Sequence, residues 1–216
     1  SKGTGILAKE FAELCDPETL RYYFAAKLND KVEDIDLNFE DYVQRINSDL
    51  VGKYLNIASR CSSFIEKNSN ALSSTFDNEL IEKAINQKEA IEACFESRNY
   101  SKAVRLIMDI ADLTNKYIND NTPWKKDIDE AAQIATTALN VFNILSIYLS
   151  PIIPNITSEA FKFLNQEKES FNDIELYLKN NINKYKPLLK RLEPIVIPEE
   201  KPMSEEENYI NIDQFA

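Results

Sequence analysis

Three residues of this 216-residue chain have side chains suited to reading an unpaired nucleic-acid base. Asn56 and Arg60 are four residues apart, a spacing that places both on one face of a helix. An amide offers a donor and an acceptor, and a guanidinium offers a planar fork of donors, so the pair could hydrogen-bond the edge of a base. Trp124, the only tryptophan, follows Pro123 among polar neighbours and could stack on the face of a base.

Each of these residues also has an ordinary structural explanation. A lone tryptophan is usually a core residue. Asn56 and Arg60 could instead make a hydrogen bond on the helix surface, or an ion pair with a carboxylate. Contact with an RNA backbone is the role we expect of three nearby lysines: Lys53, Lys125 and Lys126.

The composition excludes several kinds of catalytic site. The absence of histidine excludes Ser-His-Asp and Cys-His nucleophiles, histidine bases and histidine metal ligands. The three cysteines are far apart and form no CxxC pair, so we expect buried thiols in a reducing cytoplasm and no metal site. All three glycines lie within the first 52 residues, which leaves no glycine-rich phosphate loop beyond the N-terminus.

Charge is spread unevenly along the chain. A net charge of −11 is unusual for a nucleic-acid binder, so any such role must rest on local chemistry. Residues 194–216 contain six acids and one lysine, whereas Lys179–Arg191 contains five bases and no acid. This basic run could contact RNA, remain solvated, or dock on an acidic face of another domain.

The hydrophobic pattern predicts an all-α protein. Apolar residues recur at steps of three and four, and glycine is scarce. We expect helices over residues 6–14, 17–28, 38–67, 77–95, 100–119, 128–149 and 157–164, and a last helix or turn over 174–178. Four residues are the expected N-caps: Asp16, Asn38, Asp77 and Thr157. Four or five long helices with short connections predict an antiparallel helix bundle.

The chain divides into four predicted parts. Residues 1–37 form a connective segment with an extended stretch near its end, and residues 38–193 form the bundle with its basic segment. Residues 194–208 are an acidic, proline-rich linker, and residues 209–216 alternate like the first strand of a further domain. The polar start of the chain suggests an excised piece. The longest apolar run, Val141–Leu149, is too short to span a membrane.

Several segments resemble the C-terminal half of the methionyl-tRNA synthetases, which are class I enzymes. Ser1-Lys2-Gly3-Thr4 resembles the end of the KMSKS signature, with Ser1 as its last residue, although Thr4 stands where many class I enzymes have Asn. Residues 16–23, DPETLRYY, are similar to the LRYY segment that follows KMSKS. Residues 34–60 resemble the first bundle helix, and NDNTPW at 119–124 resembles the anticodon-loop platform.

This resemblance implies a role for each candidate residue. In that family an Asn and an Arg on this helix, with the Trp that follows Pro, recognise the CAU anticodon. These roles would fall to Asn56, Arg60 and Trp124, with Pro123 shaping the platform. The Trp would stack on the first anticodon base, a cytosine, and the Asn and Arg would contact the same base.

The resemblance also implies what the whole synthetase needs. Such an enzyme attaches methionine to tRNA(Met) with ATP and Mg²⁺, and its catalytic half can hold a structural Zn²⁺. We expect that half to precede Ser1 and to be this chain's partner in cis, so that the chain alone is inactive and binds no cofactor. Residues 209–216 resemble the start of a C-terminal OB-fold that binds tRNA and forms a homodimer. The protein would be cytoplasmic, with no membrane contact.

Two other interpretations stay open. The chain could be the anticodon-binding domain of a cysteine, leucine, isoleucine or valine synthetase, since these share the bundle and an LRYY-type segment. It could also be a helical scaffold that binds protein partners. Asn56 and Arg60 together with Pro123 and Trp124 favour methionine over the sister enzymes.

Overall fold

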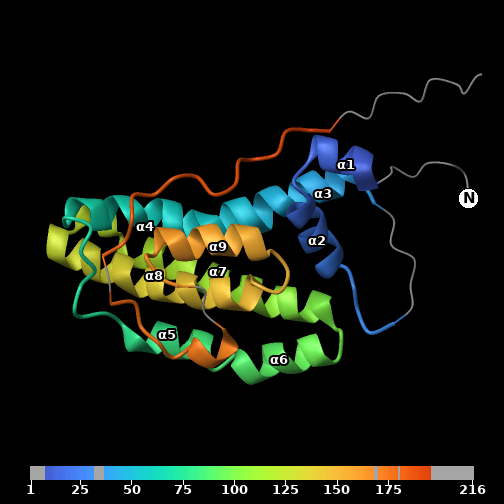
Figure 1. Cartoon of the computed structure of the whole chain (residues 1–216). Helices are drawn as coiled ribbons and strands as arrows, with labels where there is room; N and C mark the ends of the chain where they lie inside the picture. The colour runs from blue at the N-terminus through green and yellow to red at the C-terminus, as the bar shows by residue number, and fades with distance from the viewer. Residues whose placement is uncertain (1–7, 32–36, 168–169, 180, 196–216) are drawn as a thin grey trace, which may run out of the picture.

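The computed structural model describes residues 8–31, 37–167, 170–179 and 181–195. Ser1, most of the predicted acidic linker and the strand expected at 209–216 lie outside these residues. Every regular element in the described part is helical, which confirms the all-α bundle (Figure 1). The longer helices are α1 (Ala8–Leu14), α2 (Pro17–Ala25), α3 (Phe39–Arg45), α4 (Leu55–Lys67), α5 (Asn78–Ile85), α6 (Lys88–Glu96), α7 (Tyr100–Asn121), α8 (Ile128–Leu149) and α9 (Pro154–Phe163).

Helix α8 is the centre of the bundle. It packs against α4, α5, α7 and α9, and the side chains from Ala131 onward are buried except Gln133. Its alanines allow the neighbouring helices to approach closely, and its larger apolar residues fill the space between them. Among the described residues only α8 is long and apolar enough to cross a membrane, but 94% of its apolar stretch is buried, as in the core helix of a globular domain.

The helix predicted over residues 38–67 is one continuous rod with an irregular middle. α3 begins at its expected N-cap, Asn38, and leads through a π-helical segment, η1 (Ile46–Tyr54), into α4. At its end the backbone N–H of Leu55 donates to the carbonyl of Leu50, five residues back. A Cβ added at Gly52 would lie 3.0 Å from the Asn47 carbonyl oxygen, which explains a glycine inside this helix.

Two expectations about helix boundaries were wrong. The helix predicted over 77–95 is split at Asn86–Gln87, because α5 packs on α8 whereas α6 packs on α7. Helix α9 begins at Pro154, not after an N-cap at Thr157. The Thr157 hydroxyl donates back to the Ile153 carbonyl over 3.1 Å. The turn expected at 174–178 follows a short 3₁₀ helix, η3 (Phe171–Asp173).

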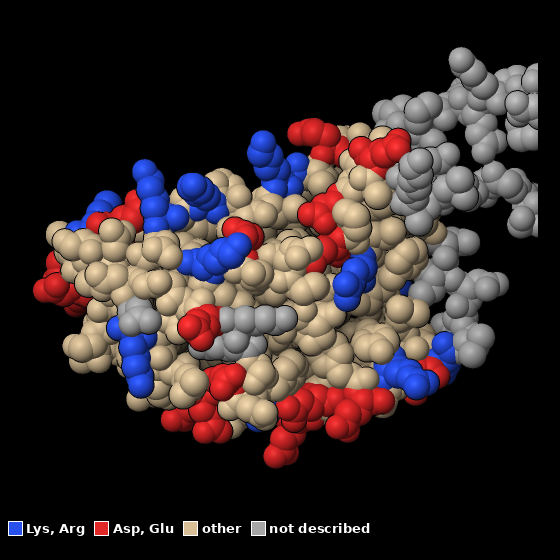
Figure 2. Space-filling view, in the orientation of Figure 1, with Lys and Arg blue, Asp and Glu red and all other residues tan. Residues whose placement is uncertain are grey.

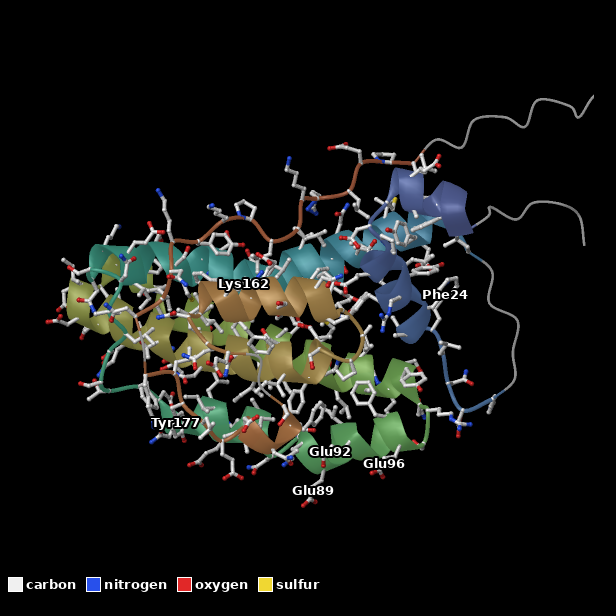
Figure 3. The ribbon with its side chains drawn as sticks, in the orientation of Figure 1. Phe24, Glu89, Glu92, Glu96, Lys162 and Tyr177 are labelled. Carbon is white, nitrogen blue, oxygen red and sulfur yellow. The ribbon has the colours of Figure 1, made fainter. Side chains whose placement is uncertain are left out.

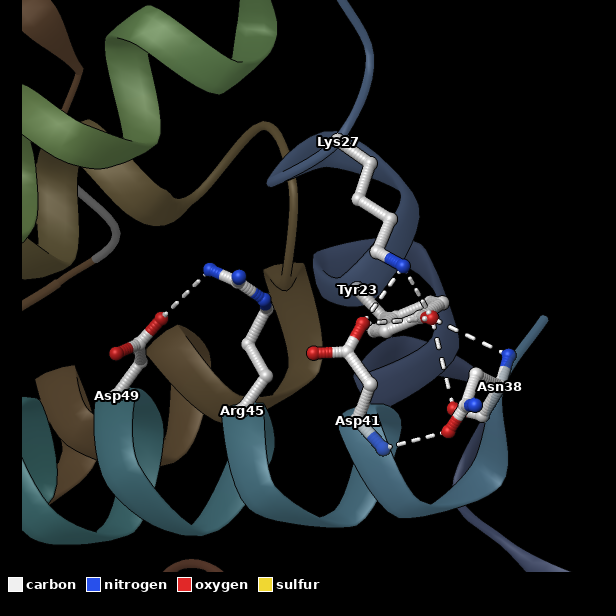
Figure 4. Close-up of polar contacts among 6 residues, drawn as sticks. All are labelled: Tyr23, Lys27, Asn38, Asp41, Arg45 and Asp49. Carbon is white, nitrogen blue, oxygen red and sulfur yellow. Dashed lines mark hydrogen bonds and ion pairs between the residues drawn. The ribbon is translucent and has the colours of Figure 1, made fainter. Parts of the chain in front are cut away.

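The LRYY residues hold the connective segment on the bundle. Arg21 Nη2 donates to the Pro151 carbonyl over 3.0 Å, and the buried Tyr22 hydroxyl donates to Asp49 Oδ2 over 3.1 Å. The Tyr23 hydroxyl donates to Asp41 Oδ2 over 3.0 Å (Figure 4). The Lys27 ammonium also bonds Asp41 and lowers the pKa of that carboxyl. The motif that suggested the family therefore docks α2 against α3 and η1.

The basic segment runs back along the bundle in an extended conformation (Figure 1). The Asn47 amide holds it, since Nδ2 donates to the Leu192 carbonyl over 2.8 Å and Oδ1 accepts from the Leu192 N–H over 2.7 Å. All five bases of Lys179–Arg191 are exposed. Figure 2 shows Lys and Arg gathered along the upper edge, where this segment runs, and Asp and Glu along the lower edge.

Glu18 provides a test of how the connective segment is held. Its carboxylate, 5% exposed, accepts from the backbone N–H groups of Asn155 (2.7 Å) and Ile156 (2.9 Å) at the start of α9. Glu18→Ala leaves both donors unpaired, so we expect it to lower the free energy of unfolding by about 2–3 kcal/mol in a urea titration. The exposed Glu159→Ala on α9 should cost under about 0.5 kcal/mol. Equal costs would contradict this role of Glu18.

Candidate nucleic-acid interface

Asn56 and Arg60 both lie on the side of α4 that faces α7. Asn56 Nδ2 donates to Asn115 Oδ1 over 3.0 Å, and Arg60 Nη1 reaches the same oxygen over 3.5 Å. Arg60 Nη2 donates to Asn119 Oδ1 over 2.6 Å. Their partners are therefore amides of α7, and neither residue pairs with a carboxylate among the described residues.

Asn115 is the residue that sequence reasoning missed. Besides accepting from α4, its Nδ2 donates to the carbonyls of Lys53 and Ala111, each over 3.0 Å. Both halves of the amide are thus used, which fixes its orientation and with it the positions of Asn56 and Arg60. The signal in the sequence was the polar series Asp112, Asn115 and Asn119, which follows one face of a helix otherwise rich in apolar residues.

Trp124 lies on the 3₁₀ turn η2 (Pro123–Lys125), which links α7 to α8. Thr122, before it, has φ 45° and ψ 57°, a left-handed conformation that a β-branched residue adopts only under strain. Pro123 is buried, whereas Trp124 is 52% exposed, so the tryptophan is not a core residue. The Arg60 guanidinium carbon is 5.8 Å from the centroid of the Trp124 ring, within the range of a cation–π contact.

The three lysines expected to contact RNA differ in their surroundings. Lys53 Nζ is 2.7 Å from Asp112 Oδ2, and Lys126 Nζ is 3.2 Å from Glu130 Oε2. Lys125 is exposed and makes no ion pair with a described residue. Of the three, Lys125 is therefore the one whose charge no carboxylate of the described part offsets.

The interface holds groups that bind and none suited to covalent chemistry. Burial raises the pKa of the Cys61 thiol, next to Arg60, to about 12, although the guanidinium acts in the opposite direction. Its thiolate is therefore scarce at neutral pH. In the described part of the chain no group of three or more His, Cys, Asp or Glu residues could hold a metal ion.

The Asn115 contacts can be tested by substitution. Asn115→Ala leaves the Lys53 carbonyl and the Arg60 and Asn56 donors without their partner, so we expect a loss of about 1–3 kcal/mol in unfolding free energy. Asn121→Ala on the same helix removes only a bond to the Tyr117 carbonyl within α7 and should cost less. Stability unchanged in Asn115→Ala, measured by urea denaturation, would contradict this role.

Two protein families match the chain. The family described as "tRNA synthetases class I (M)" matches residues 1–62, and "Anticodon-binding domain of tRNA ligase" matches residues 77–207. Methionine–tRNA ligase from Neisseria meningitidis (strain Z2491) is 46% identical over 201 residues, which is 89% of this chain and 29% of that protein. The enzyme of the same name from Psychrobacter sp. PRwf-1 is 44% identical over the same shares of the two chains.

Solved structures agree on the fold. The free form of Mycobacterium tuberculosis methionyl-tRNA synthetase superposes with a TM-score of 0.79 at 20% identity, over 88% of this chain and 42% of that one. The same enzyme bound to methionyl-adenylate also gives 0.79. Because the anticodon-binding family matches over half of the chain, this chain belongs to the anticodon-binding domains of tRNA ligases. The class I (M) match and the 44–46% identical relatives identify the family as that of the methionyl-tRNA synthetases. It spans under a third of the length of the curated relatives named above.

Proposed function

We propose that this chain reads the CAU anticodon of tRNA(Met) on behalf of a methionine–tRNA ligase. The observation that carries the proposal is the assembly of Asn56, Arg60 and the exposed Trp124 at one end of the α4–α7 pair. Reading RNA sequence usually means stacking an unpaired base on an aromatic ring and hydrogen-bonding its edge, and these three side chains offer both.

Trp124 supplies the stacking surface for the first anticodon base. Its ring is half exposed on a turn that the buried Pro123 holds against the bundle. Such a stack contributes about 1–3 kcal/mol and is available to any base. Selectivity for cytosine must therefore come from the edge contacts.

Asn56 and Arg60 have unused groups that match the cytosine edge. Asn56 donates to Asn115, but its Oδ1 accepts from no described residue and is free to accept from the cytosine amino group. Arg60 uses one hydrogen on each of two nitrogens and has further donors for the ring nitrogen and the carbonyl oxygen of cytosine. Uracil presents an N–H and a carbonyl where cytosine presents an acceptor and an amino group. The contacts to the ring nitrogen and to the amino group would therefore be lost.

Charge restricts the side from which RNA approaches. Glu89, Glu92 and Glu96 lie along α6 at the lower edge of the bundle (Figure 3), whereas the recognition residues lie on α4 and on the turn between α7 and α8. Like charges oppose phosphates at that surface, whereas Arg60 and Lys125 stand beside Trp124. An acidic module of this kind limits nonspecific RNA binding while leaving one face open to the anticodon.

The rest of the ligase reaction belongs to other parts of such an enzyme. We infer that a catalytic domain in cis joins methionine to tRNA(Met) with ATP and Mg²⁺, with or without a structural Zn²⁺, in the cytoplasm. Ser1 as the end of KMSKS and a dimer made through a further domain remain predictions of the same kind. No contact of the described residues favours a protein scaffold or a sister synthetase.

Anisotropy titration with labelled anticodon stem-loops tests the proposal. We expect this chain to bind a CAU loop more tightly than a UAU loop at the same salt concentration. Trp124→Ala should weaken CAU binding by about ten- to a hundredfold, since a stacked base is lost. Trp124→Phe keeps a smaller ring, so its affinity for the CAU loop should lie between those of wild type and Trp124→Ala. Equal binding to both loops, or unchanged binding by a folded Trp124→Ala variant, would overturn the assignment.

A further inference from the structure

A polar groove continues from the recognition residues toward the connective segment. On the rod formed by α3, η1 and α4, polar residues follow one face at steps of three and four: Arg45, Asp49, Lys53, Asn56 and Arg60. A matching series lies on α7: Ser101, Arg105, Asp109, Asp112, Asn115 and Asn119. The Lys53–Asp112 ion pair and the Asn56–Asn115 bond join the two series across the groove.

The end of the groove away from Trp124 opens into a pocket of about 320 Å³. Arg45 and Asp49 line it from the rod, and Ser101, Arg105 and Asp109 line it from α7. A pocket of this size holds a phosphate group with its water, and a hydroxyl and two guanidiniums are groups that bind one.

Both guanidiniums at this pocket make few contacts with polar groups of the described residues. The Nε of Arg45 is buried and makes no hydrogen bond, and Nη1 reaches Asp49 Oδ2 only at 3.7 Å. Arg105 is exposed and makes no hydrogen bond or ion pair with the described residues. Because this Nε is shut off from solvent, an anion in the pocket would meet the terminal Nη groups of Arg45, whose one described partner is Asp49 at 3.7 Å.

The carboxylates near the pocket are partly committed elsewhere. Asp49 accepts from the hydroxyls of Tyr22, at 3.1 Å, and Ser48, at 3.0 Å. Asp112 is paired with Lys53. Of the two carboxylates that line the pocket, Asp49 and Asp109, only Asp109 is exposed and without an ion pair among the described residues. One such carboxylate opposes an anion there without neutralising both arginines.

We propose that Arg45 and Arg105 together bind one backbone phosphate of tRNA, in the stem of the anticodon arm. This inference rests on the proposed function, because it takes the anticodon loop to lie at Trp124. Arginine forks bind phosphate oxygens through two parallel hydrogen bonds, and two forks facing one pocket surround a single phosphate. The contact positions the RNA and does not read its sequence.

The separation along α7 agrees with a site in the stem. Fourteen residues separate Arg105 from Asn119, which at about 1.5 Å per residue is roughly 21 Å along the helix. Phosphates of one strand are roughly 3.4 Å apart along the axis of B-form DNA and closer together in A-form RNA, so this distance covers at least about six nucleotides. Six nucleotides from the first anticodon base lies beyond the unpaired loop, in the paired stem.

The test compares two substitutions that remove the guanidiniums with one that removes a remote cation. Arg45→Gln and Arg105→Gln should each weaken binding of the CAU stem-loop by about tenfold, and by the same factor for the UAU loop. The slope of log affinity against log salt should become shallower by about one for the lost phosphate contact. The control is Lys162→Gln, which removes an exposed cation on α9 outside the groove (Figure 3) and should change neither quantity.

Asp109→Asn should change the affinity for the stem-loops in the opposite direction. Removing this exposed carboxylate from the pocket should tighten binding of both loops by about two- to fivefold. Misfolding would weaken binding, so it cannot imitate this result. Circular dichroism of each variant separates misfolding from a lost contact.

The outcomes distinguish this inference from the function on which it rests. A CAU preference that persists in every variant, with affinity lowered only by the arginine substitutions, supports both. Arginine variants that bind like the Lys162→Gln control, with the CAU preference intact, overturn the phosphate site alone. Loss of the CAU preference in wild type overturns the proposed function. Inorganic phosphate that displaces the stem-loop at micromolar concentration from wild type, but not from the arginine variants, would indicate a free-phosphate site. That result would contradict the assignment to RNA.

Discussion

The recognition surface depends on one amide that joins two helices. Asn115 accepts from Asn56 and Arg60 of α4 and donates to the Lys53 carbonyl, which belongs to the π-helical segment of the same rod. All of these bonds act at once, so α4 cannot slide or rotate against α7 without breaking several of them. The position of Arg60 beside Trp124 follows from this constraint, since the tryptophan lies on the turn that ends α7.

The apolar and polar parts of the bundle have separate tasks. Helix α8 packs against both α4 and α7 and holds them at a fixed spacing, while the polar groove between them stays at the edge of the core. The connective segment is tied to the same frame through Glu18, Arg21, Tyr22 and Tyr23. A rigid frame of this kind lets a small set of exposed side chains read a flexible RNA loop. The entropy of ordering the protein is lost when the chain folds, so it does not weaken RNA binding.

Much of the fold and of the site followed from local patterns. Steps of three and four predicted the long helices, and the spacing of Asn56 and Arg60 correctly placed them on one face of a helix. What local patterns could not predict depends on tertiary contacts. The break between α5 and α6 comes from packing on different helices, and the start of α9 uses a carboxylate from residue 18. Asn115 lies about sixty positions from its partners on α4, so only the folded chain brings them together. The roles of the site residues in RNA binding, and the division of the chain into four parts, remain predictions.

The fluorescence of Trp124 reports directly on base stacking at the anticodon site, because it is the only tryptophan in the chain and no other residue contributes tryptophan emission. The measurement is a titration of this emission with the CAU stem-loop and with the UAU loop, in wild type and in Asn56→Ala. We expect saturable quenching by CAU, as a base stacks on the indole, with a weaker response to UAU and in the variant. Binding seen by anisotropy without any change in tryptophan emission would contradict this stacking, because the base would then lie elsewhere.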